Sequence, residues 1–173
     1  TKYKMLILPD IWKFDERLKS KINDYLAKGG KLLLSGVSGL DDNNEFCVDT
    51  GVKFIGENGF RPTYFIPEFD TVNGKTEYLM RAVNYRFDNI DAEIVANGQN
   101  PYFNRTAEHF CSHQHAPNDR SLTYPTAAIK GNIAYIGWDI FRGYAESGDF
   151  HIKELVAYVI ERLMNGDFTI ESS

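Results

Sequence analysis

The sequence predicts an α/β fold built on a mainly parallel sheet, and three observations support this fold class. Residues 3–40 read as a strand, a crossover helix and a second strand, which is the unit of parallel sheets covered on both faces. A β-hairpin and an amphipathic helix are predicted near the C-terminus. With 173 residues, the chain suits one domain with a continuous core, and it is shorter than the roughly 250 residues of a (β/α)₈ barrel.

The first predicted unit is defined by two apolar runs and the segment between them. Met5–Leu8 forms the first run, and residues 14–28 place apolar side chains on one helical face. Asp15 is the expected N-cap of this helix, and Gly29 is positioned to end it in the left-handed conformation. The second apolar run, residues 31–34, follows directly, so strand, helix and strand succeed one another with short connections.

Polar and small residues follow both strands of this unit. Pro9 and Asp10 come after the first strand, and residues 35–39 (Ser-Gly-Val-Ser-Gly) come after the second. In open α/β sheets, ligands and chemistry lie just beyond the carboxyl ends of the strands. We therefore expect a crevice at Asp10 and Ser38.

The middle of the chain predicts short strands separated by turns, at residues 52–55, 63–66, 78–87 and 93–96. Pro62 and Pro67 bracket the second of these and cannot donate to a β-ladder, so it is expected to be an edge strand or a short one. Residues 97–124 show no regular pattern. A segment of this length is usually a functional or interface loop, or a region where the assignment of elements fails.

The C-terminal third predicts a hairpin and a helix. Residues 126–129 and 133–137 are the two predicted strands of the hairpin, and Gly131-Asn132 between them is a hairpin turn signal. Asp149 can cap a helix that ends before Gly166. This helix carries a wide apolar stripe made of Ile152, Leu155, Val156, Val159, Ile160, Leu163 and Met164.

Charge and hydropathy exclude several kinds of partner. The formal net charge is -5, the pI is near 5.4, and no run of five Lys or Arg residues exists. These values give no electrostatic reason to bind nucleic acid or anionic lipid. No apolar stretch approaches the roughly 20 residues that span a bilayer. We expect neither nucleic acid nor a membrane as a partner.

The cysteines and the first residue bear on the cellular compartment and on whether the chain is part of a longer protein. Cys47 and Cys111 lie far apart, so the chain does not read as a disulfide scaffold and its compartment stays undetermined. The first residue is Thr1 rather than Met, and a strand begins almost at once, with nothing before it to cover a sheet edge. We therefore expect the chain to be part of a longer protein.

Ser38 is the first candidate for catalysis, because a nucleophilic serine often sits where a strand turns sharply into the next element. The elbow pattern needs glycine two residues after the serine, but Leu40 stands there and Gly39 comes one residue early. The serine also needs a base, usually a histidine held by a carboxylate. A tight turn made of small residues explains the segment better.

The densest cluster of potential metal ligands is His109, Cys111, His113 and His115. In an extended segment all four would point to one side, but successive side chains would stand roughly 6.5 Å apart, so only neighbouring pairs could share an ion. A metal site would need a bent loop or ligands from elsewhere, such as Glu108 or Asp119. The simpler interpretation is a hydrogen-bonded polar loop, so we expect no metal and no other cofactor.

Glycoside hydrolysis requires two carboxylates roughly 5–10 Å apart. Glu57, Glu68, Glu108 and Asp139 could supply such a pair, although almost any acidic domain would do so. Exposed aromatic residues could stack on sugars, but aromatic residues near strands are more often part of a core. Residues 138–142 (Trp-Asp-Ile-Phe-Arg) are of most interest, because they follow the last predicted strand and border the expected crevice.

Residues 6–10 (LILPD) and residues 26–36 (LAKGGKLLLSG), followed by Ser38-Gly39, resemble the trimerisation domain of glycoside hydrolase family 42 beta-galactosidases. Residues 108–113 and 133–142 resemble the C-terminal region of related glycosyl hydrolases. The resemblance implies a class I glutamine amidotransferase-like, flavodoxin-like three-layer fold. That family places a cysteine where this chain has Val37 or Ser38, and a histidine with a carboxylate where it has residues 137–139 (Gly-Trp-Asp). Both catalytic signatures are missing.

The resemblance therefore implies a non-catalytic accessory or oligomerisation domain of a glycoside hydrolase in carbohydrate metabolism. Its expected partners are a catalytic barrel in the same parent chain and further copies of itself, with carbohydrate as a further possibility. It also implies that a strand and a helix precede Thr1. Candidate crevice or interface residues are Asp10, Ser38, Trp138, Asp139 and Arg142, together with residues 97–124, and no catalytic residue is expected.

Two other functions stay open on sequence grounds. One is a small amidotransferase-like hydrolase with Ser38 or Cys111 as an unusual nucleophile, activated by one of the clustered histidines. The other is a sugar-binding module that uses aromatic loop residues. Catalysis by Ser38 or Cys111 would require an imidazole within hydrogen-bonding reach, which the sequence alone does not decide.

Overall fold

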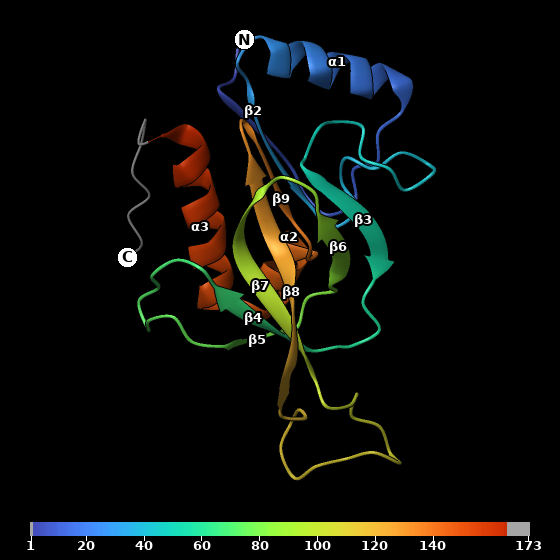
Figure 1. Ribbon diagram of the computed structural model, residues 1–173, viewed down its shortest axis with the longest axis vertical. Coiled ribbons are helices and arrows are strands. Elements are labelled where there is room, and N and C mark those ends of the chain that lie inside the picture. Colours follow the sequence, from blue (N-terminus) through green and yellow to red (C-terminus); the bar gives the residue numbers. More distant parts are fainter. Residues whose placement is uncertain (1, 166–173) are drawn as a thin grey trace.

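The computed structural model describes residues 2–165 and places a seven-stranded sheet at the centre of the chain, with a small two-stranded sheet beside it (Figure 1). The order in the large sheet is β1-β2-β9-β8-β7-β4-β5, and the small sheet pairs β3 with β6. The strands are β1 (Met5–Leu8), β2 (Lys31–Ser35), β3 (Val52–Glu57), β4 (Thr63–Pro67), β5 (Tyr78–Met80), β6 (Tyr85–Asn89), β7 (Glu93–Pro101), β8 (Asn118–Lys130) and β9 (Ile133–Ile136). The helices are α1 (Glu16–Ala27), α2 (Ile140–Ser147) and α3 (Phe150–Met164).

The predicted strand-helix-strand unit is present. β1 pairs in parallel with β2, and β2 pairs in parallel with β9. Asp15 caps α1 as expected, because its side chain accepts a hydrogen bond from the amide of Leu18 at 2.7 Å. Gly29, at φ 80°, follows the helix and lets the chain turn back into β2.

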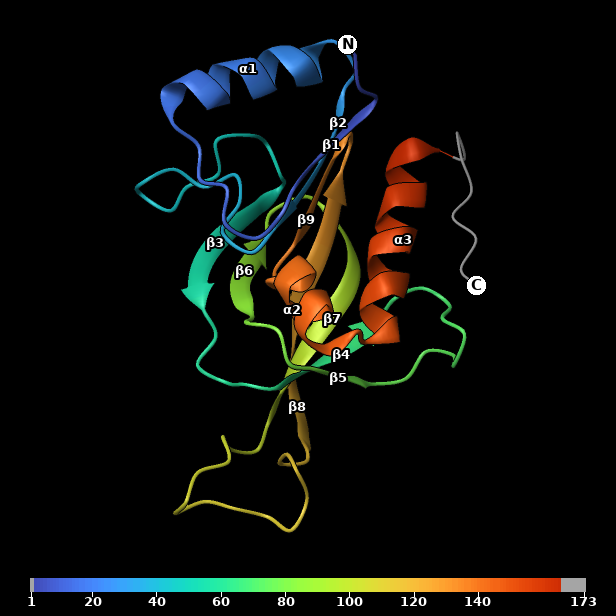
Figure 2. The same ribbon diagram turned by 180° about the vertical axis from the view of Figure 1, so that it is seen from behind.

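The predicted fold class is wrong. Only the β1–β2 and β2–β9 ladders are parallel, and the other ladders are antiparallel, so the sheet is mixed rather than mainly parallel. It is strongly curled, and the described residues contain three helices (Figures 1 and 2). A flavodoxin-like or glutamine amidotransferase-like three-layer fold therefore does not describe this chain.

The physical reason lies in the connections. A parallel neighbour requires a crossover of a dozen or more residues, usually a helix, whereas antiparallel strands can be joined by a tight turn. From β3 to β9 the chain contains no helix, and β7, β8 and β9 pair antiparallel in succession. The β8–β9 hairpin around Gly131-Asn132 agrees with the sequence prediction, and so does α3, which begins after Asp149. The residues after Asn165, including the predicted stop at Gly166, lie outside the described residues.

The segment predicted to be irregular, residues 97–124, is largely strand. β7 continues to Pro101 and β8 begins at Asn118, so the two strands form a long hairpin that projects from the body of the molecule (Figure 1). Residues 102–117 form the loop at its tip, which we call the tip loop. The strand predicted between Pro62 and Pro67 is short, but it is not an edge strand, because β4 pairs with β5 on one side and with β7 on the other.

The two faces of the large sheet carry separate hydrophobic cores. On one face α3 packs on Leu33, Ile136 and Trp138, and on the other face Ile22 of α1 belongs to the cluster that contains Leu32 and Leu34. Successive residues of β2 thus serve opposite cores, as expected for a strand that is buried on both sides. Within residues 2–165, no helix combines the length and apolar character of a transmembrane span.

Leu33→Ala tests the importance of the core beneath α3. Leu33 is fully buried, so the substitution removes buried methyl groups and leaves a cavity. We expect the free energy of unfolding, measured by urea denaturation, to fall by about 2–5 kcal/mol. Leu122→Ala is the matched control, because Leu122 is 56% exposed, and its effect should stay within about 0.5 kcal/mol. Equal losses in the two variants would contradict this account.

Candidate functional site at the carboxyl ends of the parallel strands

Asp10 connects the carboxyl ends of β1 and β2 to the start of α2. Its amide donates to the hydroxyl of Ser35 at 2.9 Å, and that hydroxyl donates to Asp10 Oδ1 at 2.6 Å. Its carboxylate also accepts hydrogen bonds from the amides of Phe141, at 3.4 Å, and Arg142, at 2.8 Å. A side chain from the segment that follows β1 therefore caps a helix that begins more than 120 residues later.

This arrangement depends on local backbone geometry. Asp10 has φ 57°, a left-handed conformation that Asp and Asn tolerate better than most residues. The N-terminus of α2 carries unpaired amides and a partial positive charge, so the buried carboxylate is favourable there. Asp139, which precedes α2 directly, makes no side-chain capping bond of its own. Asp10 takes this role instead.

Ser38 also has a structural role. It is fully buried, and its hydroxyl accepts a hydrogen bond from the amide of Trp12 at 3.0 Å. Among residues 2–165, no hydrogen bond joins Ser38 to a histidine. Gly36 completes the turn at φ 58°, where an added Cβ would lie 2.4 Å from Asp139 Oδ1 and 2.6 Å from the carbonyl oxygen of Asp10. The close approach of these chains requires glycine at this position.

Asp139 is the most perturbed carboxyl group of the crevice. It is 4% exposed, and its Oδ1 atom has no hydrogen-bond partner among the described residues. Burial, followed by the nearby Asp10 carboxylate, raises the pKa of Asp139 to about 6. The hydroxyl of Tyr85 interacts with the same carboxyl group, and burial together with Asp139 raises the pKa of Tyr85 to about 12. The crevice thus holds two carboxyl groups and a phenol in a restricted space.

The other two candidates near the crevice differ in their exposure. Trp138 is fully buried, its indole N–H donates to Thr63 Oγ1 at 3.1 Å, and its ring meets that of Phe65 edge to face. It therefore offers no surface to a sugar or a partner protein. Arg142 is exposed, and its positive charge opposes the rise in the pKa of Asp139.

The histidine and cysteine cluster lies in the tip loop and does not form a ligand set. Cys111 Sγ donates to the carbonyl oxygens of His113, at 3.6 Å, and His115, at 3.3 Å, rather than to an imidazole. His109 is within ring contact of Phe103. Within the part of the chain that the structure describes, no three His, Cys, Asp or Glu side chains are grouped to hold a metal ion.

Sequence reasoning missed several residues of this site. Ser35 carries the hydrogen bonds to Asp10, although it was treated only as part of a turn, and its position directly after a buried strand was a usable signal. Tyr85 arrives from β6, distant in sequence, and no local pattern identifies it. α2 was not predicted, because its N-terminus is capped by Asp10, which is distant in the sequence.

The fold and the site together define a sheet-rich domain with a curled, mixed sheet, in which the polar groups at the strand ends are engaged in structural hydrogen bonds. Comparison with known families then identifies the chain as a member of the beta-galactosidase trimerisation domain family, whose model matches residues 1–140. The resemblance noted from the sequence is thereby confirmed. No curated protein matches the chain significantly.

Solved structures agree with this assignment. Alpha-L-fucosidase isoenzyme 2 from Paenibacillus thiaminolyticus is 37% identical with a TM-score of 0.90, over 95% of this chain and 25% of that chain. A GH42 beta-galactosidase from G. stearothermophilus is 14% identical with a TM-score of 0.52, over 90% of this chain and 22% of that chain. An exo-beta-1,4-mannosidase from Opitutaceae bacterium strain TAV5 is 11% identical with a TM-score of 0.54, over 94% of this chain and 26% of that chain. The last two likenesses show the fold alone, and the chain spans about a quarter of each of these proteins.

Asp10→Ala tests the clamp at the strand ends. The substitution leaves the hydroxyl of Ser35 and two amides of α2 without their partner, so the free energy of unfolding should fall by about 2–4 kcal/mol. Asp15→Ala removes an exposed N-cap from α1 and should cost about 1 kcal/mol. Chemical denaturation of both variants makes the comparison. An Asp10→Ala loss no larger than that of Asp15→Ala would refute the clamp.

Asp139→Asn tests the raised pKa. Because the folded protein holds this proton up to a pH of about 6 and the unfolded chain only up to about 3.8, the contribution of Asp139 to stability falls as the pH rises through this window. The Asn variant does not titrate, so its stability relative to the native chain should increase by about 1–3 kcal/mol across the window. Urea unfolding at several pH values measures the difference. A difference that is independent of pH would show that the pKa is not raised.

Proposed function

We propose that this chain, as one domain spanning residues 1–173, is a non-catalytic assembly domain of a longer glycoside hydrolase. In this proposal a catalytic barrel belongs to the same parent chain, and the domain helps to bring subunits together. The proposal depends on one observation, which is that the polar side chains at the strand ends form hydrogen bonds that hold the fold together. Asp10 caps α2, and the Ser38 hydroxyl is bound by a backbone amide, so neither side chain has the arrangement of an activated catalytic group.

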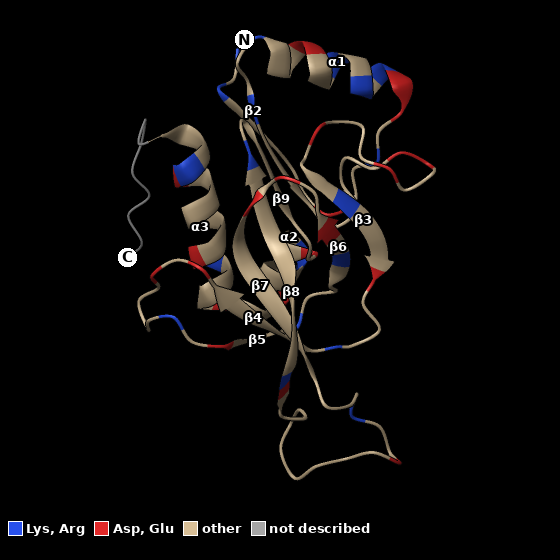
Figure 3. Cartoon of the chain, viewed as in Figure 1, with Lys and Arg blue, Asp and Glu red and all other residues tan. Residues whose placement is uncertain are grey.

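The projecting hairpin supports a role in assembly. Its tip loop exposes Tyr102 (64%) and Phe110 (70%), and the neighbouring part of β8 exposes Leu122 (56%). Charged residues are sparse around the tip loop (Figure 3). Exposed apolar and aromatic side chains with few charges are typical of protein contact surfaces. We infer that the tip loop is the part of this domain that meets a neighbouring subunit or the barrel.

A role of the parent protein in carbohydrate metabolism is supported by the names of the similar structures. The names of the similar structures describe a fucosidase, a beta-galactosidase and a mannosidase, which act on different sugars. A domain common to enzymes of different specificity is better suited to assembly than to sugar choice. In our proposal, the sugar specificity of the parent protein therefore resides outside this domain.

The hydrolase alternative has less support. It requires Ser38 or Cys111 to be activated by an imidazole, but both groups bond to backbone atoms. The sugar-binding alternative loses Trp138, which is fully buried, although Tyr102 and Tyr144 are exposed.

The decisive experiment measures activity and assembly separately. We expect the chain by itself to hydrolyse neither nitrophenyl glycosides nor simple esters, and Ser38→Ala to leave this result unchanged. We also expect the parent protein to lose its oligomeric state, measured by sedimentation velocity, when Phe110 and Tyr102 are both replaced by Ser. Turnover by the isolated chain that disappears in Ser38→Ala would overturn the non-catalytic role. An unchanged oligomeric state would overturn the role of the tip loop.

A further inference from the structure

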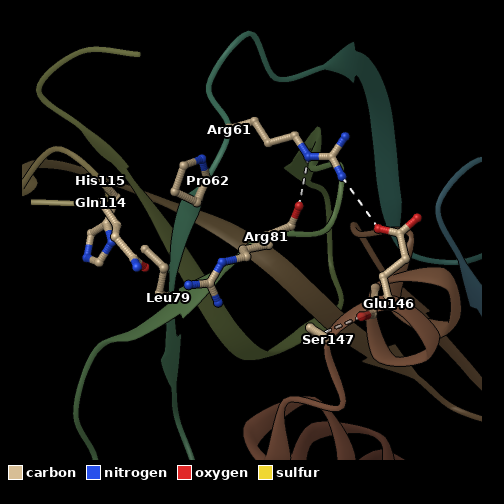
Figure 4. Close-up of a pocket in the computed structure, with 9 residues that line it drawn as sticks. Arg61, Pro62, Leu79, Arg81, Gln114, His115, Glu146 and Ser147 are labelled. Atoms are coloured by element: carbon tan, nitrogen blue, oxygen red, sulfur yellow. Dashed lines mark hydrogen bonds and ion pairs between the residues drawn. The ribbon is translucent and has the colours of Figure 1, made fainter. Parts of the chain in front are cut away.

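A cavity of about 370 Å³ lies at the C-terminal turn of α2, at the other end of this helix from the crevice. Its walls come from the segment before β4, the end of β5, the tip loop and α2 (Figure 4). The polar side chains that line it include Arg61, Arg81, Gln114, His115 and Glu146. The cavity is of the size of small-molecule sites, and segments that are distant in sequence build it.

Side-chain hydrogen bonds hold the backbone of the tip loop where it forms a wall of this cavity. Three successive carbonyl oxygens accept hydrogen bonds: that of Gln114 from Arg105 at 3.3 Å, that of His115 from Cys111 at 3.3 Å, and that of Ala116 from the buried Tyr64 hydroxyl at 2.7 Å. This ordering explains the role of Cys111 and gives Gln114 and His115 defined positions on the wall. The side chains of Arg81 and Gln114 extend toward one another across the cavity (Figure 4).

The two guanidinium groups keep unused hydrogen-bonding capacity. Arg81 has an ion pair with Asp149 at 3.9 Å, and its guanidinium donates no hydrogen bond to another described residue. Arg61 donates from Nε to the carbonyl oxygen of Arg81 at 2.8 Å, and its terminal nitrogen lies 3.8 Å from Glu146. The Arg61–Glu146 pair is long and exposed, so it contributes little energy and a ligand can replace it. The Arg81–Asp149 pair is equally long, and it leaves N–H donors of Arg81 free for a ligand.

The remaining groups on the walls complete a recognition surface. His115 Nδ1 is buried and has no hydrogen-bond partner among residues 2–165, so a ligand group that reaches this atom would satisfy it. In the last turns of α2, the carbonyl oxygens of Gly143 and Tyr144 accept hydrogen bonds from the Ser147 hydroxyl and the Gly148 amide, both at 2.8 Å. Two carboxylates oppose the binding of an anion, because Glu146 lies on the cavity wall and Asp149 forms the ion pair with Arg81.

We propose that this cavity binds a small ligand through an oxyanion group, a carboxylate or a phosphate, with Arg81 as the principal contact. A guanidinium group presents a planar fork of N–H donors that matches these two groups, and a charge-assisted bond to it is about twice as strong as a neutral one. Arg61 adds positive charge, and Gln114 and His115 supply polar contacts to the rest of the ligand. The site is separate from the strand-end crevice, and its existence does not depend on the assembly role.

Isothermal titration calorimetry with four probes tests the proposal: inorganic phosphate, galactose 6-phosphate, galacturonate and galactose. We expect at least one of the three anions to bind and the neutral sugar not to bind. Binding of both phosphates without galacturonate identifies phosphate as the group, and binding of galacturonate alone identifies a carboxylate. Absence of binding by all three anions, or equal binding of galactose, overturns the proposal.

Three variants assign the binding to this cavity. Arg81→Ala should weaken anion binding by about tenfold or more, whereas Glu146→Gln should tighten it because an opposing carboxylate is removed. Arg17→Ala, on exposed α1, removes the same charge elsewhere and should have no effect. Thermal denaturation without ligand confirms that each variant is folded. An anion that binds Arg81→Ala as well as the native chain, or a weaker affinity in Glu146→Gln, contradicts the site.

Discussion

The organisation of this domain depends on one buried carboxylate. Asp10 lies two residues after β1, bonds to Ser35 at the end of β2, and caps α2, which begins after β9. A single residue with a left-handed backbone conformation thus joins the ends of β1 and β2 to the helix that follows β9. A hydrogen bond between ionised and neutral groups is stronger than one between neutral groups, and a buried carboxylate without partners is costly. The geometry of the crevice is therefore closely coupled to the stability of the fold.

This coupling also accounts for the polar groups at the strand ends. Asp10, Ser35 and Ser38 form hydrogen bonds to backbone amides or to one another. Asp139 is the exception, because its Oδ1 atom is unpartnered and its pKa is raised to about 6. A perturbed carboxyl group marks many active sites, but structural burial perturbs pKa values as well. At Asp139, burial and the neighbouring Asp10 are sufficient causes.

Similarity to other proteins extends from close relatives to distant proteins that share only the fold. The chain belongs to the beta-galactosidase trimerisation domain family, and a bacterial fucosidase contains a closely similar domain in about a quarter of its length. More distant glycosidases share the fold at 11–14% identity.

The sequence by itself determined the local elements whose signals are contained in a few neighbouring residues. These are α1 with its Asp15 cap, the two apolar strands around it, the hairpin at Gly131-Asn132 and α3 with its apolar stripe. The tertiary structure alone decided the order and direction of the middle strands, the extension of β7 and β8 into one long hairpin, and the presence of α2. It also decided that Ser38 and Trp138 are buried and that Asp10, Ser35, Tyr85 and Asp139 meet. The reason is that a strand pairs, and a helix is capped, through groups that lie tens of residues away, and no local periodicity records which partner will be chosen.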